Sequence, residues 1–226
     1  MSMASLTERR TTADVVFDHL YDQIISLGLM PGTKMSEAEI ADQFGVSRQP
    51  VRDAFNRLGN MQLLLIQPQK ATLVQKFSLE SIQSARFIRL GVELEVARAA
   101  MGNWSDTWTG AFYENLAAQE KAVKDSDARA FHTLDEEFHA LIAQVAGQPA
   151  AFDLILQKKG MVDRICVLSL KQTHEMDILV TDHKKILAAL SRGDAQKLET
   201  CMREHLSRIE KTIATVSKSH AEYFTD

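Results

Sequence analysis

The sequence predicts a mainly α-helical chain in two parts: a small N-terminal part that ends in a β-hairpin, then an antiparallel all-helical bundle. Three observations lead to this prediction. Residues 36–58 contain two short helical patterns joined by a glycine. Two short apolar runs follow, on either side of a turn that contains a proline. From Ser78 onward the apolar residues recur with helical spacing, and no run alternates as a strand would.

Composition favours a globular protein of one large or two small domains. The chain has 226 residues, and 45% of them are hydrophobic, which supports a sizeable core. We find no apolar run long enough to cross a membrane and no signal peptide. The two cysteines, Cys166 and Cys201, have no spacing that indicates a disulfide framework. We therefore expect a cytoplasmic protein. Its net charge of −4 argues mildly against nucleic-acid binding.

The first predicted helices precede a tight turn. Residues 12–28 have an amphipathic pattern, with an apolar stripe made of Val16, Leu20, Ile24 and Leu27. The run from Ser36 to Glu39 has the form of a capping box, which predicts a helix over residues 37–44. Gly45 then provides the kind of turn that joins the two helices of a helix-turn-helix.

The second helix of this motif follows Ser47, whose hydroxyl we expect to accept from free N–H groups of the first turn. Its buried stripe is predicted to be Val51, Phe55 and Leu58. Arg48 and Arg52 lie four residues apart and share a different face. Arginine grips phosphate or guanine through a bidentate fork, so this face suits the major groove of DNA. The alternative is a surface helix whose arginines are simply solvated.

A wing is predicted after this helix. Residues 63–66 and 72–74 are short apolar runs around a turn at Pro68–Ala71, with Lys70 near the tip. Residues 1–75 hold seven Lys or Arg and eight Asp or Glu, a balance of −1. Positive charge must therefore be local if this part binds DNA, with the acidic residues of the first helix facing away. The expected basic surface consists of Arg48, Arg52, Arg57 and Lys70.

Six helices are expected beyond a short linker at Lys76-Phe77. Ser78 is a capping residue, and Gly147 and Gly193 are stop signals. The approximate spans are 78–102, 104–124, 127–147, 149–171, 174–191 and 194–217. Antiparallel helices of this length form a bundle.

Four coordinating residues fall inside apolar stripes of the predicted bundle: Asp135, His139, His183 and His205. Asp135 and His139 share one face of the third bundle helix. His183 lies ten residues before Gly193 and His205 twelve after it, about 15 Å and 18 Å along two antiparallel arms. The two histidines should thus face one core at similar heights. A buried histidine is usually a satisfied core residue, but this set also suits Zn²⁺ or Ni²⁺, with Mn²⁺ an alternative.

Residues 11–75 resemble the winged helix-turn-helix of the GntR family of bacterial transcription regulators. The resemblance rests on Pro31-Gly32, Ser36 to Ala41, Gly45 to Arg48, Pro50 to Ala54 and Leu58. Ala38 stands where many members have a DNA-contacting arginine, and Gln62 and Ala71 stand where the family usually has glycines. With the basic helix, the resemblance leads us to predict a DNA interface made of Ser47, Arg48, Gln49, Arg52 and Lys70.

Residues 78–217 resemble the FCD ligand-binding domain of the FadR-type GntR regulators. The resemblance rests on Arg89-x-x-x-Glu93, Asp135-x-x-x-His139, His183 and the run from Ala189 to Asp194 that leads to His205. In metal-binding members these Asp and His positions coordinate the ion, and an effector reaches it from a central cavity. The implied domains are 1–75, a winged helix-turn-helix, and 78–226, an FCD-like domain that binds effector and metal and dimerises.

The predicted function is that of an effector-responsive DNA-binding transcription regulator. We expect a homodimer that binds an inverted-repeat operator in double-stranded DNA. Its effector is expected to be a small organic acid that completes the coordination of the metal. Arg89 is the candidate for the effector's other end, and a salt bridge to Glu93 is the alternative role. A metalloenzyme that activates water is the competing function, and a bundle whose polar residues only pair with one another is a third.

Overall fold

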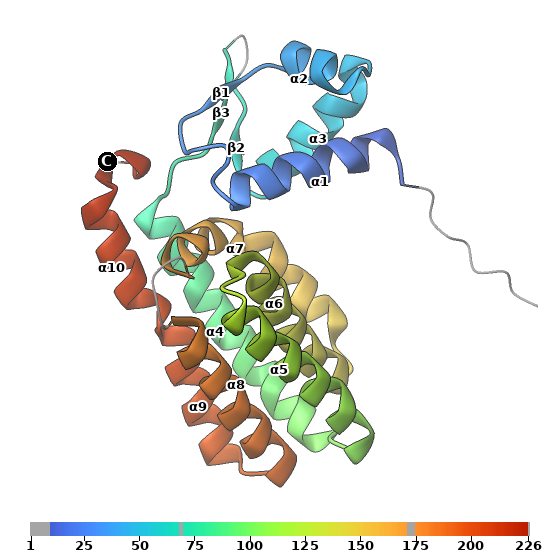
Figure 1. Ribbon diagram of the computed structural model, residues 1–226, viewed down its shortest axis with the longest axis vertical. Helices are drawn as coiled ribbons and strands as arrows, with labels where there is room; N and C mark the ends of the chain where they lie inside the picture. The colour runs from blue at the N-terminus through green and yellow to red at the C-terminus, as the bar shows by residue number, and fades with distance from the viewer. Residues whose placement is uncertain (1–9, 68–69, 171–174, 226) are drawn as a thin grey trace, which may run out of the picture. The chain divides into compact units, whose positions relative to one another are not determined.

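The computed structural model describes residues 10–67, 70–170 and 175–225 of the chain (Figure 1). The chain divides into two compact units, residues 1–76 and residues 77–226. Within the described residues, no helix combines the length and the apolar character needed to cross a membrane. The fold is mainly helical with one small sheet, as predicted.

The first unit contains three helices and three short strands in its described residues. In chain order they are α1 (Thr12–Ile25), β1 (Lys34–Met35), α2 (Glu37–Phe44), α3 (Arg48–Asn60), β2 (Leu64–Leu65) and β3 (Thr72–Val74). Helix α1 begins with a capping box between Thr11 and Asp14. It stops at Ile25, short of the predicted Gly28, because Leu27 takes a left-handed φ of 63° that a helix cannot include. Leu27 is nevertheless buried.

Helices α2 and α3 form the predicted helix-turn-helix. The Ser36 hydroxyl accepts from the Glu39 amide at 3.1 Å, as the capping box requires. Gly45 ends α2 with a φ of 64°, and an added Cβ there would meet no atom within 4 Å, so the backbone conformation alone favours glycine. The predicted stripe of α3 is buried: Val51, Phe55 and Leu58. The prediction for Ser47 was wrong in one respect: it occupies the N-cap but makes no side-chain capping bond.

The wing is an antiparallel three-stranded sheet with strand order β1-β3-β2. The predicted hairpin pairs Leu64 with Val74, and β1 adds an outer strand that pairs Lys34 with Leu73. Sequence reasoning missed β1 because two residues give no periodic signal. Gln62 keeps a φ of 57°, a left-handed conformation that costs a non-glycine residue roughly 1–2 kcal/mol. Pro68 and Gln69 of the predicted turn lie outside the described residues.

The second unit is a helical bundle. Its elements are α4 (Leu79–Gly102), η1 (Asp106–Trp108), α5 (Thr109–Lys124), α6 (Ala128–Val145), α7 (Pro149–Leu170), α8 (Glu175–Arg192), α9 (Ala195–Ser207), α10 (Ile209–Ser219) and η2 (Ala221–Tyr223). Two predicted spans differ. The helix expected from residue 104 begins at Thr109, after a 3-10 turn. The span 194–217 is divided at Arg208, whose amide bonds to the carbonyl of His205 three residues earlier.

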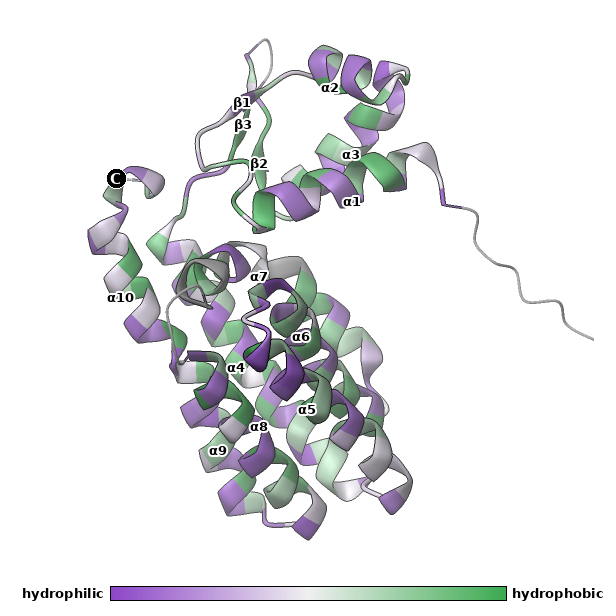
Figure 2. Cartoon of the chain, in the orientation of Figure 1, coloured by the Kyte–Doolittle hydropathy of each residue, from purple (hydrophilic) through white to green (hydrophobic). Residues whose placement is uncertain are grey.

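Hydrophilic and hydrophobic residues alternate along the bundle helices, as amphipathic packing requires (Figure 2). The main core cluster lies between α4, α5, α6, α7, α8 and α9 and includes Phe112, Phe138, Ile142, Ile186 and Met202. Phe138 of α6 is followed by His139, and Ile186 of α8 lies three residues beyond His183. The same packing that buries these apolar residues therefore carries the histidines inward.

Candidate metal centre and DNA-reading helix

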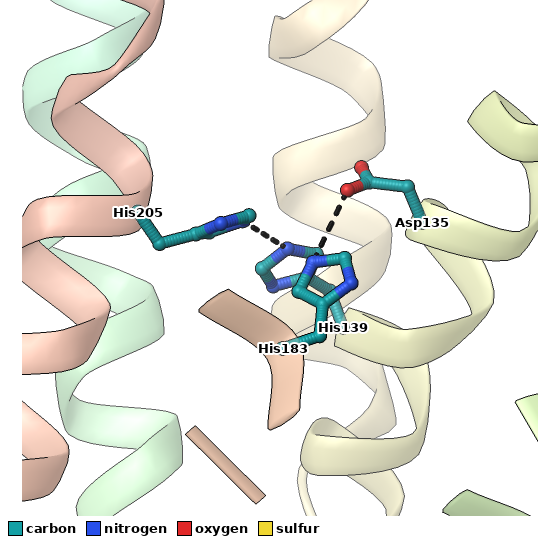
Figure 3. Close-up of side chains that lie close together, drawn as sticks. All are labelled: Asp135, His139, His183 and His205. Carbon is teal, nitrogen blue, oxygen red and sulfur yellow. Dashed lines mark hydrogen bonds and ion pairs between the residues drawn. The ribbon is translucent and has the colours of Figure 1, made fainter. Parts of the chain in front are cut away.

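The structure brings together the four coordinating residues that the sequence singled out. Asp135 and His139 come from α6, His183 from α8 and His205 from α9, and their side chains point toward one another (Figure 3). His183 Nε2 lies 3.3 Å from Asp135 Oδ1, and His139 Nε2 lies 3.1 Å from His205 Nε2. One donor atom from each residue lies within 4.8 Å of the other three. Atoms bound to one ion at about 2.1 Å have this kind of spacing.

The other ring nitrogen of each histidine faces an oxygen of a neighbouring helix. His139 Nδ1 lies 2.5 Å from Glu93 Oε2 of α4. His183 Nδ1 lies 2.8 Å from Gln119 Oε1 of α5. His205 Nδ1 lies 3.8 Å from Asp182 Oδ2 of α8. The close oxygen neighbours of His139 and His183 favour the tautomer that carries its proton on Nδ1, which leaves the Nε2 lone pair for a metal.

Gln119 is fixed in the orientation that this tautomer needs. Its Nε2 donates to Asn115 Oδ1 at 2.7 Å, and Asn115 Nδ2 donates to the carbonyl of Leu134 at 3.0 Å. The amide oxygen of Gln119 is therefore the atom that faces His183, and it can only accept. His183 must donate from Nδ1, so its Nε2 lone pair turns toward Asp135.

Burial favours the neutral, metal-binding state of His183 and His205. It lowers the pKa of His183 to about 4 and also lowers the pKa of His205. For Asp135, burial opposes ionisation, but the adjacent His183 and the other nearby imidazoles hold the pKa of its carboxyl well below its usual range. At neutral pH His183 and His205 therefore present imidazole lone pairs beside the Asp135 carboxylate. Such a set of acceptors without donors fits a divalent cation.

A cavity of about 550 Å³ adjoins these donors and falls in the size range of small-ligand sites. Asp135, His205 and Arg89 all line it. Arg89 also forms an ion pair with Glu93, so the alternative role predicted for it is present in the structure. Burial opposes the charge on Arg89, but Glu93 raises its pKa above the usual value. Glu93 therefore links Arg89 to His139.

Sequence reasoning missed the residues that support the donors: Glu93 as partner of His139, Gln119 and Asp182. It also did not predict a second group, in which His132 and Asp163 line the cavity with His132 Nε2 3.3 Å from Asp163 Oδ1, and Glu136 is close by. A carboxylate or amide on an amphipathic helix looks like an ordinary polar residue. Only contacts between helices reveal these roles, although the Asp182-His183 neighbours gave a weak signal.

The predicted DNA-reading residues are exposed on the first unit. Ser47, Arg48, Gln49 and Arg52 lie at the start of α3, and Lys70 is exposed beside the wing. Arg52 is held by Glu37 of α2 through a two-pronged ion pair, with NH2 to Oε2 at 2.9 Å. Gln49 Nε2 donates to Asp53 Oδ1 at 2.9 Å. These contacts fix both side chains in the free protein.

The acidic residues of the first helix were expected to face away from the basic surface, and this was wrong for Asp14, which pairs with Arg57. The ion pair is 2.8 Å long, and the guanidinium carbon of Arg57 lies 3.9 Å from the ring centre of Phe17. The acidic first helix thus neutralises Arg57, because both residues pack at the contact between α1 and α3. The remaining basic residues of the predicted surface are Arg48, Arg52 and Lys70.

Comparison with known proteins gives a consistent result for both units. Residues 12–74 match the bacterial regulatory proteins of the gntR family, and residues 85–208 match the FCD domain. The chain is 31% identical to the HTH-type transcriptional repressor RspR of Escherichia coli K12, over 93% of this chain and 92% of that protein.

Solved structures show the same fold. Escherichia coli McbR/YncC aligns with a TM-score of 0.77 and 21% identity, over 94% of this chain and 100% of that one. A GntR regulator from Rhodococcus sp. RHA1 aligns with a TM-score of 0.73, over 90% and 97%. The relatives are regulators and not enzymes, so the metalloenzyme prediction is set aside. The chain belongs to the GntR family of bacterial DNA-binding transcription regulators and carries an FCD domain.

Proposed function

We propose that this regulator holds a divalent metal ion in its bundle and responds to a small carboxylate that binds the ion from the cavity. The observation that carries the proposal is the convergence of Asp135 with the three imidazole Nε2 atoms, of which that of His183 is set by the hydrogen bond between its Nδ1 and Gln119. The donor set favours Zn²⁺ or Ni²⁺, with Mn²⁺ an alternative. A regulator of this kind meets its operator in the bacterial cytoplasm.

Metal content tests this proposal. Purified protein should hold close to one divalent ion per chain, measured by element-specific mass spectrometry. His183→Ala and His205→Ala should lose the ion and the thermal stabilisation that it gives by mass action. His220→Ala is the matched control, because His220 is a half-buried histidine outside the cluster. Protein that takes up no metal after exposure to Zn²⁺, Ni²⁺ and Mn²⁺ would contradict the proposal.

The start of α3 is the proposed DNA-reading surface, together with Lys70 of the wing. We expect a pool of random DNA to yield an inverted repeat when selected with this protein. Arg48→Ala should weaken binding to that repeat by roughly 1–3 kcal/mol if the arginine reads a base. Lys70→Ala should weaken binding to all sequences and reduce the salt dependence by about one ion. Arg98→Ala, an exposed arginine of the bundle, is the control. Unchanged affinity in an Arg48/Arg52 double variant would contradict the assignment.

The proposed effector is a small organic acid. Four protein donors leave positions open on a five- or six-coordinate ion, and the cavity gives access to them. Arg89 lines the same cavity and offers the planar fork that lysine lacks. A calorimetric screen of small acids against wild type, Arg89→Lys and metal-free protein tests both roles. An acid that binds all three equally would place the effector elsewhere.

A homodimer is proposed from the outer face of α4. Phe87 has 81% of its surface exposed, Ile88 beside it is also exposed, and an added Cβ at Gly91 would meet no atom within 4 Å. Residues 87, 88 and 91 share one face by helical spacing, so this face can receive a second α4 closely. A two-fold operator requires two DNA-binding units, which identifies the partner as a second copy of the chain.

A further inference from the structure

We propose that the C-terminal segment 220–225, here named the strap, clamps Phe77 and links the cavity to the residue at which the chain passes to its DNA-binding unit. Phe77 directly follows Lys76, the last residue of the first unit. The effect of a ligand on Phe77 rests on the proposed metal and effector site. The clamp itself rests only on contacts within the second unit.

The strap holds Phe77 by its backbone and its ring. The Phe77 amide donates to the carbonyl of Tyr223 at 2.8 Å, and the Thr225 amide donates to the carbonyl of Phe77 at 2.8 Å. The Phe77 and Phe224 rings lie 5.1 Å apart, and both side chains are buried. Both backbone polar groups of Phe77 are thus satisfied by residues almost 150 positions away. Loss of the strap would leave them to find other partners.

Helix α7 connects the same ring to the cavity. The guanidinium carbon of Arg164 lies 4.6 Å from the ring centre of Phe77, and Arg164 is fully buried. The preceding residue, Asp163, lines the cavity beside His132. Neighbouring residues of one rigid helix therefore contact the proposed ligand space and the proposed clamp. A ligand that shifts this part of α7 also shifts the cation that packs on Phe77.

The chain from the metal donors to the strap provides a second connection. Arg208 follows His205 by three residues, lines the cavity and forms a two-pronged ion pair with Asp182. Asp182 is also the oxygen partner of His205. Helix α10 begins directly after Arg208, packs against α7 and ends at the strap. A ligand in the cavity can thus act on Phe77 through α10 and through α7. Phe77 is then the shared element through which the cavity and the DNA-binding unit influence each other.

Three variants disrupt the strap: two substitutions and a truncation. Phe224→Ala removes the ring contact, and Phe224→Leu should restore most of it. Thr225→Pro removes the amide that donates to Phe77, and Phe224 already has the extended backbone that a residue before proline prefers. Glu222→Gln is the control, since Glu222 is an exposed side chain of the same segment. A chain that ends at residue 219 removes the strap entirely.

Three quantities are measured for each variant: zinc content, hydrogen exchange of the peptide containing Phe77, and affinity for the selected inverted repeat with Zn²⁺ and after EDTA treatment. In wild type, zinc should slow exchange at Phe77 and change operator affinity, by roughly fivefold or more if the coupling is of ordinary size. All three strap variants should raise the exchange rate of the Phe77 amide at least about tenfold. In these variants zinc should leave the operator affinity almost unchanged. Zinc content should stay at the wild-type value.

The outcomes are distinguishable. Unchanged Phe77 exchange in all three variants would overturn the clamp, whether or not the protein binds metal. Faster exchange with an undiminished zinc effect would overturn the link to DNA binding, as would a wild type that binds zinc without any effect on exchange or affinity. Absence of bound zinc would instead contradict the proposed metal site, and the clamp would then be decided by exchange and by metal-free operator affinity.

Discussion

Gln119 shows how a neutral residue can determine the chemistry of a charged site. It is fully buried, and its amide nitrogen is committed to Asn115, so its oxygen faces His183. Glu93 faces His139 in the same way and also pairs with Arg89. Two neighbouring helices, α4 and α5, thus influence the direction in which His139 and His183 present their lone pairs. Oxygen partners of this kind raise the affinity of histidine ligands for metal.

Replacing Gln119 should therefore weaken metal binding without removing a ligand. Gln119→Leu is expected to lower zinc affinity by roughly 10- to 100-fold, because His183 loses the acceptor that fixes its tautomer. Competition with a calibrated chelator measures this affinity. Gln144→Leu is the control, since Gln144 is an exposed glutamine on α6. Equal zinc affinity in Gln119→Leu and wild type would show that His183 is oriented by packing alone.

The buried histidines also make the metal-free protein sensitive to acid. The folded-state pKa of His183 is lowered to about 4 by burial, below the value of about 6.5 that an unfolded histidine has. The unfolded state therefore binds more protons between these values, so stability should fall as pH decreases from about 6.5 toward 4. The lowered pKa of Asp135 acts in the same direction, in that its stabilising effect is lost at still lower pH.

Urea unfolding of EDTA-treated protein at pH 7.5, 6 and 5 measures this dependence. The midpoint should decrease toward pH 5 in wild type and decrease less in His183→Gln, which has no titrating imidazole at that position. A variant that loses as much stability as wild type would assign the acid sensitivity to other groups.

At the residue scale, the donors were predictable and their supports were not. Asp135, His139, His183 and His205 interrupt apolar stripes, and helical periodicity alone places them inside the bundle. Glu93 was noted only as the partner of Arg89, and Gln119 was not noted at all, because polar residues on long helices are usually solvated. Their roles depend on distances between helices, which periodicity does not contain.

At the scale of elements, α3 carries the proposed DNA-reading residues, and α2 contacts one of them. The fork of Arg52 is occupied by Glu37, which lies on the preceding helix and holds the two helices of the motif together. Hydrogen bonding to Glu37 raises the pKa of Arg52, so the arginine stays charged throughout. If Arg52 contacts DNA as proposed, a phosphate or guanine must share or replace this carboxylate. The free energy needed to break the ion pair between Arg52 and Glu37 would reduce the net gain from contact between Arg52 and DNA.

Glu37→Gln should release Arg52 and strengthen operator binding. The gain is expected to be no more than about fivefold, since an exposed ion pair contributes roughly 0–1 kcal/mol. Fluorescence anisotropy with the selected inverted repeat measures the affinity. Glu39→Gln makes the same charge change on α2 at an exposed residue without this contact. Equal gains in the two variants would attribute the effect to net charge alone, and weaker binding in Glu37→Gln would show that the pair positions α3.

Long periodic elements were predicted more accurately than short ones. The helix-turn-helix and the bundle helices follow from apolar spacing and capping residues. The strand β1 and the break between α9 and α10 did not follow, because each depends on tertiary pairing. β1 forms because it pairs with β3. The break between α9 and α10 lies at Arg208, whose side chain binds Asp182. Leu27 likewise ends α1 by a backbone conformation that its side chain does not indicate.

At the scale of the whole molecule, the exposed face of α4 is the feature most open to a direct test of assembly. Phe87→Glu should convert the protein to a monomer, because a carboxylate at the centre of a close helix contact is buried without a partner. Loss of the second DNA-binding unit should then weaken operator binding by a factor of ten or more. Light scattering after size-exclusion chromatography measures the mass. The control is Tyr113→Glu, which changes an exposed aromatic residue of α5. A Phe87→Glu protein that remains dimeric would show that the dimer interface lies elsewhere.

The central claim is that Asp135, His139, His183 and His205 hold a metal ion in a regulator of this family. Anomalous scattering from crystals of the protein as purified, collected at the zinc, nickel and manganese edges, tests it most directly. We predict one peak per chain, about 2.0–2.2 Å from His139, His183 and His205 Nε2 and from a carboxylate oxygen of Asp135. A map without a peak at any edge after soaking in each metal, with the three imidazoles bonded to one another and to Asp135, would contradict the account.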